Sequence, residues 1–444
     1  MNTRTAHPVS ATIAALLALA ACGLPASRAA AAEGSAQGAI PVEIVERDGR
    51  YRLLRGGEVY EVKGAGLEFG NVETLVAHGG NSFRTWRTDN ERATGLEVLD
   101  RAAELGVTVA LCIEIERERH GFDYDDEQAV AAQLAYARGE VMKYKDHPAL
   151  LAWIIGNEPN LFFENPGVFD AIDDIAEMIH EVDGRHPATT ALAGFNAELA
   201  GLIRTRAPAL DFVSIQMYGD IVNLPRYLEE AGWDRPYMVT EWGATGHWEV
   251  AKTSWDAPVE QHSSEKAASY LRAWRTAIAV DPARVLGSYV FLWGQKQERT
   301  PTWYGMFLAD GAETEVIDVM HYIWNGVWPP DRAPEVRGMR LDGRPAGAEI
   351  VLAPGAAVDA AFEVVDPEGE GLRYRWQVMR ESEATQSGGD REALPETLDG
   401  LVTPGAPGQI RLAAPAEPGA YRLFAYAWDA HAKAAHANIP FLVR

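Results

Sequence analysis

Two glutamates stand where the sequence could support acid–base and nucleophilic chemistry. Glu158 follows Asn157 at the end of the apolar run "LLAWIIG", residues 150–156, and Glu241 ends the run "YMVT". A pair of neighbouring carboxyl groups titrates in two separate steps, because two like charges oppose joint ionisation. One glutamate can therefore keep a proton to donate, while the other stays ionised and attacks an electrophilic carbon.

The segments around these glutamates alternate between apolar strands and amphipathic helices. A charge-free apolar run such as 150–156 is typical of a strand buried on both faces of a parallel sheet. Eight such strands are expected at residues 61–67, 82–86, 108–115, 150–156, 189–193, 212–218, 237–242 and 288–293. Helical patterns separate them, among others at 95–106, 127–144, 168–183 and 263–279, and several stop at Gly or before His-Pro.

Eight strand–helix units predict an α/β fold, a (β/α)8 TIM barrel over residues 41–328. The alternative is an open doubly wound sheet, which carries a glycine-rich phosphate loop after its first strand. The sequence at that place, "KGAGLEFG", has a different glycine spacing and no helix start of the required kind. We therefore expect the barrel.

The carboxyl ends of the strands form the active face of a TIM barrel. Carboxylates, amides, aromatic rings and one clear cation are expected there: Glu68, Arg84, Trp86, Asn157, Glu158, Gln216, Tyr218, Glu241, Trp242 and Trp293. Glu158 and Glu241 end the fourth and seventh strands, so they should face each other across the mouth. This arrangement suits a retaining glycosidase, in which one carboxyl group protonates the glycosidic oxygen and the other attacks the anomeric carbon.

Four of these side chains have an expected role in the bond-breaking step. Arg84 would hold Glu241 ionised as the nucleophile, and Tyr218 would donate a hydrogen bond to it. Glu158 would keep its proton because of the nearby negative charge, and would act first as acid and then as base.

The other polar and aromatic side chains are expected to contact the substrate or support the site. Asn157 would bond the sugar 2-hydroxyl, and Trp293 would form an apolar floor under the sugar ring. The remaining candidates are Trp86, Trp242, Glu68 and Gln216. Glu68 could instead form a structural ion pair, and each tryptophan could instead pack the top of the barrel.

The motifs that carry these residues resemble those of glycoside hydrolase clan A. "GNEP" on the fourth strand and "TEWG" on the seventh look like the acid/base and nucleophile motifs of the clan. "VYEVKGAGLE", "NSFRTW" and "HPALLAWIIGNEP" are most similar to the catalytic barrel of family 2, with family 5 close, over roughly residues 42 to 327. The resemblance implies a retaining β-glycosidase. Gln216 departs from it, because family 2 has Asn and family 5 has His at that place.

The composition narrows the choice of substrate. The 444 residues include 64 acidic and 40 basic side chains, and the net charge of −24 disfavours nucleic acid and anionic lipid surfaces. With the family resemblance, this favours a neutral β-linked oligo- or polysaccharide, such as a β-glucan, as the substrate.

Two alternative functions remain open. A β-glycan transglycosylase would use the same residues, whereas a non-catalytic glycan-binding lipoprotein should lack one of the two carboxylates. No cofactor, metal ion or obligate protein partner is expected.

Two long loops follow the last two strands and carry aromatic residues. Residues 243–265 include Trp248, and residues 293–307 include Trp303 and Tyr304. Trp303 and Tyr304 could stack on sugars in distal subsites, or they could hold their own loop in place. Loops of this length around one mouth favour a cleft for an oligosaccharide.

The N-terminus has the pattern of an export signal. Residues 1–22 resemble a bacterial lipoprotein signal peptide, with the apolar core "ATIAALLALA" and the lipobox-like "LAACG". The resemblance implies acylation of Cys22, and Gly23 after it implies an outer-membrane protein facing the periplasm or the cell surface. An ordinary secretory signal is the alternative. Residues 23–40 form a small-residue tether, and Cys112 is expected in the core.

Helical periodicity stops at the proline-rich linker of residues 329–336. Residues 337–444 alternate short apolar runs with Pro, Gly and Asp turns, which predicts a small β-sandwich. "DPEGEGLRYRWQV" resembles part of a fibronectin type III or cadherin-like module, which implies an immunoglobulin-like sandwich. Such a module could bind glycan or simply pack against the barrel, and the sequence leaves both open.

Overall fold

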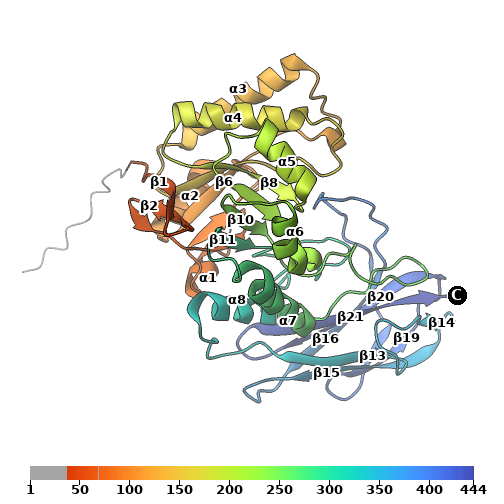
Figure 1. Ribbon diagram of the computed structural model, residues 1–444. Helices are drawn as coiled ribbons and strands as arrows, with labels where there is room; N and C mark the ends of the chain where they lie inside the picture. Colours follow the sequence, from red (N-terminus) through yellow and green to blue (C-terminus); the bar gives the residue numbers. More distant parts are fainter. Residues whose placement is uncertain (1–37, 69) are drawn as a thin grey trace, which may run out of the picture. The chain divides into compact units, whose positions relative to one another are not determined.

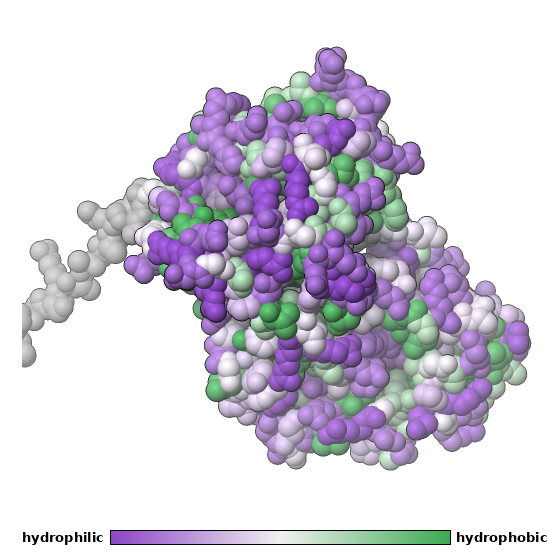
Figure 2. All heavy atoms as spheres, viewed as in Figure 1, coloured by the Kyte–Doolittle hydropathy of each residue, from purple (hydrophilic) through white to green (hydrophobic). Residues whose placement is uncertain are grey.

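A computed structural model describes residues 38–68 and 70–444, and Gly38–Arg444 form one compact unit. The predicted signal peptide, Cys22 and residues 23–37 of the tether lie outside the described residues. In the part that the structure describes, none of the helices combines the length and the apolar character that a membrane span requires. The face seen in Figure 2 is mainly hydrophilic, with small hydrophobic groups scattered across it.

Eight parallel strands close into the predicted barrel (Figure 1). They are β4 (Val62–Gly66), β5 (Ser82–Arg84), β6 (Thr108–Ile113), β7 (Leu150–Asn157), β8 (Ala188–Ala193), β9 (Val213–Gln216), β10 (Tyr237–Glu241) and β11 (Val285–Val290). The last strand lies three residues earlier than the expected 288–293. After Val290 the chain no longer forms a regular ladder and makes single hydrogen bonds, such as that from Trp293 N to the Gly66 carbonyl.

Helices surround the barrel strands (Figure 1). They are α1 (Val72–Ala77), α2 (Gly95–Glu104), α3 (Glu127–Tyr144), α4 (Gly167–Val182), α5 (Ala197–Arg206), α6 (Leu224–Glu230), α7 (Ser263–Ala273) and α8 (Glu315–Asn325), with short 3-10 turns η1 (Glu118–His120) and η2 (Gly219–Asn223) and a π turn η3 (Trp274–Ile278). Their apolar stripes explain the packing: α4 buries Ile172, Ile175 and Ile179, which repeat at helical spacing. A capping box between Thr94 and Glu97 sets the start of α2.

A three-stranded antiparallel sheet, which we did not predict, precedes the barrel. It consists of β1 (Val42–Arg47), β2 (Arg50–Arg55) and β3 (Glu58–Val59). Val42 and Leu53 are buried in one apolar cluster with barrel residues that include Cys112 and Met238. Val42 N also donates to the Arg185 carbonyl, which lies in the loop before β8. The small sheet therefore covers the end of the barrel opposite to the carboxyl ends of the strands.

The C-terminal region forms two sheets that share one apolar core, as predicted for a sandwich. One sheet contains β13 (Glu335–Leu341), β15 (Ala357–Val365), β18 (Val402–Pro404) and β19 (Gln409–Ala413). The other contains β12 (Glu313–Thr314), β14 (Val351–Leu352), β16 (Arg373–Arg380), β17 (Thr397–Leu398), β20 (Gly419–Trp428) and β21 (Lys433–Val443). Because β12 precedes α8 in the chain, the barrel segment supplies a strand to the sandwich.

Buried polar contacts join the barrel to the sandwich. α7 and α8 lie against the C-terminal sheets (Figure 1), and Val336 N donates to Ser264 Oγ at 2.8 Å. Glu260 accepts from Lys266 Nζ, and at 2.6 Å from Asn438 Nδ2 on β21. Burial alone would raise the pKa of Glu260, but the charges of Lys266 and of His436, were it protonated, and the hydrogen bonds lower it to about 2. The interface thus holds an ionised carboxylate away from water.

Candidate active site

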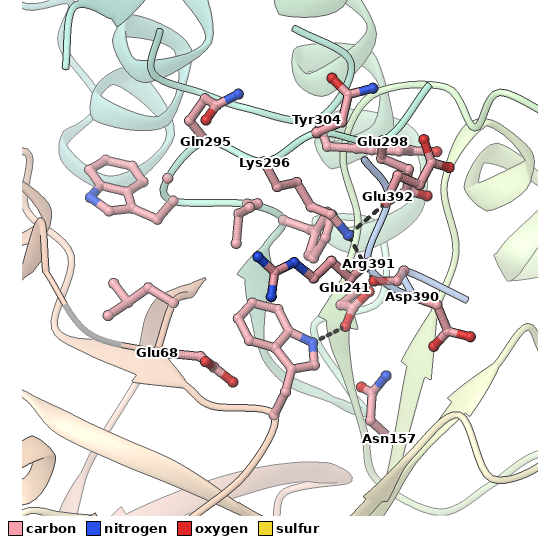
Figure 3. A pocket seen from close by; sticks show the side chains of 18 of the residues that line it. Glu68, Asn157, Glu241, Gln295, Lys296, Glu298, Tyr304, Asp390, Arg391 and Glu392 are labelled. Atoms are coloured by element: carbon pink, nitrogen blue, oxygen red, sulfur yellow. Dashed lines mark hydrogen bonds and ion pairs between the residues drawn. The ribbon is translucent and has the colours of Figure 1, made fainter. Parts of the chain in front are cut away.

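Glu241 is the last residue of β10, and its carboxylate is held by four donors. Arg84 Nη1 (3.0 Å), Trp86 Nε1 (2.7 Å) and Gln216 Nε2 (3.1 Å) donate to Oε1. Tyr218 OH donates to Oε2 at 2.7 Å. Figure 3 labels Glu241 and marks a contact of its carboxylate with a dashed line. A carboxylate that accepts this many hydrogen bonds is stabilised in its ionised form.

The donors around Glu241 come from separate strands of the barrel. Arg84 is on β5 and Gln216 on β9, and both are buried. Burial and the charge of Glu241 raise the pKa of Tyr218 well above its usual value. Tyr218 therefore keeps its hydroxyl proton and acts as a donor. The closed barrel brings these strand ends together, which is why residues more than 150 positions apart meet at one carboxylate.

Asn157 ends β7, and its side-chain amide is oriented by two hydrogen bonds. Its Oδ1 accepts from Arg84 Nη2 and from Gln216 Nε2, both at 2.8 Å. Because these two hydrogen bonds hold the amide oxygen below the cavity, the N–H donors of Nδ2 face the cavity. Arg84 binds the nucleophile candidate and Asn157 at once.

Glu158 follows β7 in a left-handed backbone conformation, with a φ of 51°. This region is costly for residues other than Gly and often marks a functional position. Burial raises the pKa of Glu158, and the negative charge of Glu241 raises it further, to about 7, although the positive charges of Arg119 and Arg117 oppose the shift. Glu158 therefore holds a proton near neutral pH under the influence of Glu241, which is the division of roles that acid and nucleophile require.

A cavity of about 1000 Å³ opens above these residues. Its lining includes Glu68, Trp86, Asn157, Glu158, Tyr218, Glu241 and Trp293. A second cavity of about 510 Å³ adjoins it and contains the exposed aromatic side chains Phe162 and Trp248. Glu158, Tyr218, Trp248 and Gly388 line both cavities, so Glu158 stands at their junction.

Residues 72–287 match the family model described as "Glycosyl hydrolases family 2, TIM barrel domain". This part of the chain is thus similar to the barrel domain of family 2 glycoside hydrolases. A segment of 96 residues is 31% identical to "Mannan endo-1,4-beta-mannosidase 4" of Oryza sativa subsp. japonica, covering 18% of this chain and 21% of the relative.

Solved structures of β-glucuronidases have the same fold. "Bacteroides uniformis beta-glucuronidase 2 covalently bound to cyclophellitol-6-carboxylate aziridine" matches with a TM-score of 0.50 and 12% identity, over 91% of this chain and 48% of that one. "Faecalibacterium prausnitzii Beta-glucuronidase" matches with a TM-score of 0.50 and 17% identity, over 64% of this chain and 52% of that one. The chain thus spans about half the length of the structures that it matches.

The closed barrel brings most of the predicted site residues to the cavity, either in its lining or directly beneath it. Glu68 lines the cavity and pairs with Arg87 at 2.9 Å. Trp293 also lines it, yet is only 1% exposed, because its ring packs against Phe307 and Trp324. Glu68 therefore combines the two roles that we had set against each other, an ion pair and a position at the cavity.

Trp242 is the exception, and our expectation for it was wrong. It is 0% exposed, does not line either cavity and packs against Tyr270 of α7. Neighbouring residues of a strand point to opposite faces. Because Glu241 points into the barrel mouth, Trp242 must point outward into the layer of helices.

The long loop after β11 is held from within by its aromatic residues. Trp303 is 1% exposed and donates from Nε1 to the Thr245 carbonyl at 2.9 Å. Tyr304 is 2% exposed, lines the cavity and packs edge-on against Tyr218. Of the two roles considered, Trp303 has the structural one, whereas Tyr304 supports the tyrosine that binds Glu241.

Sequence reasoning missed several residues that line the cavity or, like Arg119, contact the residues that do. Arg117 Nε donates to the Asn157 carbonyl at 3.1 Å, and Arg119 Nη1 donates to the Glu158 carbonyl at 3.3 Å. Both belong to the charged stretch "EIERERHG". Lys296, Glu298 and residues 388–392 also line the cavity. The charged stretch follows directly after a barrel strand, and this position could have indicated that its arginines lie near the site. The sequence of residues 388–392 contains no comparable indication.

Proposed function

We propose that this protein is a retaining β-glycosidase that works by double displacement. The observation that carries the proposal is the contrast between two neighbouring glutamates: Glu241 accepts four hydrogen bonds, one of them from the buried Arg84, while Glu158 has a pKa of about 7. The match of residues 72–287 to the family 2 barrel model supports it. One group is prepared to attack and the other to donate a proton.

In the first step, Glu241 attacks the anomeric carbon while Glu158 gives its proton to the glycosidic oxygen. The bond between that carbon and oxygen breaks, the leaving group departs as an alcohol, and a covalent glycosyl-enzyme remains. In the second step, Glu158 takes a proton from water, and the water oxygen displaces Glu241. Asn157 Nδ2 donates to the sugar 2-hydroxyl, a contact that strengthens as charge develops at the anomeric carbon.

In this mechanism, each of the two cavities binds the part of the substrate on one side of the scissile bond. The glycone must lie against Glu241, which lines only the larger cavity. The leaving group must lie beyond Glu158, in the smaller cavity with Phe162 and Trp248. Exposed aromatic faces suit the apolar faces of sugar rings. The substrate that we propose is a neutral β-linked oligo- or polysaccharide, such as a β-glucan.

The smaller cavity also favours a second candidate function, β-glycan transglycosylation. An acceptor sugar stacked on Trp248 could replace water in the second step, with Glu158 taking its proton instead. Product analysis in the presence of added acceptor oligosaccharide separates the two: longer products indicate transfer, and free reducing sugar alone indicates hydrolysis. A purely glycan-binding role is disfavoured, because both carboxylates and all four donors to Glu241 are present.

Intact-mass spectrometry after exposure to a panel of activated 2-deoxy-2-fluoro β-glycosides tests the mechanism. We expect the mass to rise by one glycosyl unit, with the label on the peptide that contains Glu241. The Glu241→Gln variant is the control and should stay unlabelled. Labelling of a peptide without Glu241 would contradict the assignment of the nucleophile.

For location, we propose a lipoprotein that is acylated at Cys22 and held at the outer membrane, facing the periplasm or the cell surface. The lipobox-like "LAACG" supports this. Metabolic labelling with an alkyne fatty acid in a bacterial host tests it: the full chain should take up the label, and the Cys22→Ser variant should not. Equal labelling of the two would contradict the proposal.

A further inference from the structure

The loop between β16 and β17, residues 381–396, extends from the sandwich to the mouth of the barrel. Residues 388–392 line the larger cavity, and Gly388 also lines the smaller one. Since Glu158 stands at the same junction, the tip of this loop lies beside the expected position of the scissile bond. The C-terminal region is thus part of the cavity wall.

The loop is anchored to the barrel at several points. The buried Glu392 accepts from Arg299 N at 2.7 Å, and Arg299 Nη2 donates to the Gln386 carbonyl at 3.1 Å. Lys296 Nζ donates to the Gly389 carbonyl at 3.1 Å. These barrel residues belong to the loop after β11, so one active-site loop holds the other.

A second anchor connects the loop to the acid/base candidate. Asp390 lies 3.2 Å from His120 Nε2 and 3.8 Å from Arg119 Nη2. Arg119 also donates to the carbonyl of Glu158. One arginine therefore touches both the sandwich loop and the backbone of Glu158.

Two glycines shape the tip of the loop. Gly388 and Gly389 have φ values of 64° and 74°, a conformation that other residues adopt at a cost. A Cβ at Gly388 would lie 2.7 Å from Arg119 and 2.8 Å from Leu161. A larger residue at position 388 would therefore have to adopt a strained backbone and move the ends of these two side chains.

Arg391 stands between the anchors Asp390 and Glu392 but is not itself an anchor. Within residues 38–68 and 70–444 it makes no hydrogen bond or ion pair, and Figure 3 shows its side chain directed into the cavity. Of the charged residues in the lining, Glu68, Glu241, Glu298, Asp390 and Glu392 each have a cationic partner. The guanidinium of Arg391 thus faces the glycone side with five N–H donors unused.

We propose that the β16–β17 loop is a substrate-binding element and that Arg391 binds oxygen atoms of the glycone. The sandwich then completes the active site rather than serving only as a neighbouring module. This inference rests on the proposed function, because a glycone must occupy the larger cavity.

Steady-state kinetics of Arg391→Ala test the inference, using the 4-nitrophenyl β-glycoside that the wild-type protein hydrolyses fastest. Loss of hydrogen bonds from a charged donor should lower kcat/KM by about tenfold or more, mainly through a higher KM. Arg391→Lys should recover part of the loss. The matched control is Arg340→Ala, an exposed sandwich arginine. Among the residues that the structure describes, its guanidinium hydrogen-bonds only to the Gly343 carbonyl in its own turn.

Gly388→Val provides a second measurement, because it should displace the loop while leaving Arg391 in the chain. We expect it to raise KM as Arg391→Ala does, with an unfolding temperature close to that of the wild type. If Arg391→Ala and Gly388→Val both keep the KM of Arg340→Ala, the loop does not bind substrate and the inference is wrong. If the wild-type protein hydrolyses none of the glycosides and takes up no 2-fluoro label, the proposed function fails instead.

Discussion

Arg84 donates at once to Glu241 and to Asn157, the residue before Glu158. Its side chain is fully buried, so one guanidinium with no access to water connects the end of β10 to the end of β7. The planar group has a fixed arrangement of donors, and this allows it to set the relative positions of two oxygen atoms on different strands.

Replacing Arg84 by lysine should therefore impair catalysis although the charge is kept. Lysine is a compact point charge and cannot make both contacts in the same geometry. We expect kcat to fall by about 100-fold or more, in line with the loss of a preorganised charge partner, with a smaller change in KM. Steady-state kinetics on an activated aryl β-glycoside measure this. Arg138→Lys, at an exposed pair with Glu181 whose two residues do not line the cavity, is the control and should change kcat little.

The neutral variants of the two glutamates should impair the reaction in different ways. Glu241→Gln should abolish turnover of every substrate, because no other group can form the covalent intermediate. Glu158→Gln should spare the first step for substrates with good leaving groups, such as dinitrophenyl glycosides, which need no proton, and slow it for poor leaving groups by about 100-fold or more. Pre-steady-state bursts of released phenol measure the first step. A Glu241→Gln variant with wild-type rates would exclude the assigned mechanism.

Activity should fall as the pH rises through about 7. The acid must carry its proton in the free enzyme, and burial together with the charge of Glu241 raises the pKa of Glu158 to about 7. The basic limb of the profile of kcat/KM against pH should bend near this value. In Glu158→Gln, assayed on a dinitrophenyl glycoside, that limb should disappear. A basic limb that persists unchanged would assign it to another group.

The same shift predicts how stability depends on pH. The folded protein holds the proton of Glu158 more tightly than the unfolded chain, so this contribution to stability is complete below about pH 4.5 and is lost as the pH rises to about 7. At pH 8 the wild type keeps a half-buried charge that Glu158→Gln lacks. We expect the variant to unfold at a higher temperature than the wild type at pH 8, and at a similar one at pH 4. Differential scanning calorimetry measures both, with the exposed Glu181→Gln as control.

The interface between barrel and sandwich should respond to the loss of one buried charge. Lys266→Met leaves the Glu260 carboxylate buried with its hydroxyl and amide donors but without its cation. Breaking such a pair costs about 3–5 kcal/mol of unfolding free energy. Adding Glu260→Gln should recover much of the loss, because no unpaired charge then remains. Chemical denaturation of Lys266→Met, of the double variant and of a control, Lys252→Met, measures these free energies of unfolding. The control removes an exposed pair with Asp256 and should cost less than about 1 kcal/mol.

The strand pattern predicted the barrel well, because a strand buried on both faces has a distinctive apolar run. All eight barrel strands lie at or near their expected places, and the largest shift, three residues, is at β11. The small sheet β1–β3 was missed. Its strands are short, carry several charges and do not have the continuous apolar run that the prediction relied on.

Individual side chains were harder to place than strands. Trp242 follows Glu241 directly, and both were expected at the mouth, yet strand alternation sends them to opposite faces. Arg119 belongs to the charged stretch "EIERERHG", in which we expected no residue of the site. Whether such a side chain faces water or Glu158 depends on how its loop folds back over the strand ends, and the residue order does not encode that directly.

The order of residues along the chain is enough to predict the barrel and the strand ends that bear Glu158, Asn157 and Glu241. The parallel strands of a closed barrel have their carboxyl ends on one face. A residue that ends such a strand can therefore be assigned to that face from its position along the strand alone. The presence of residues 388–392 in the same cavity, by contrast, follows from the folded arrangement of the barrel and the sandwich. Their approach depends on how the sandwich packs on α7 and α8 and on the anchors at Arg119 and Arg299, contacts between segments that are far apart in the chain.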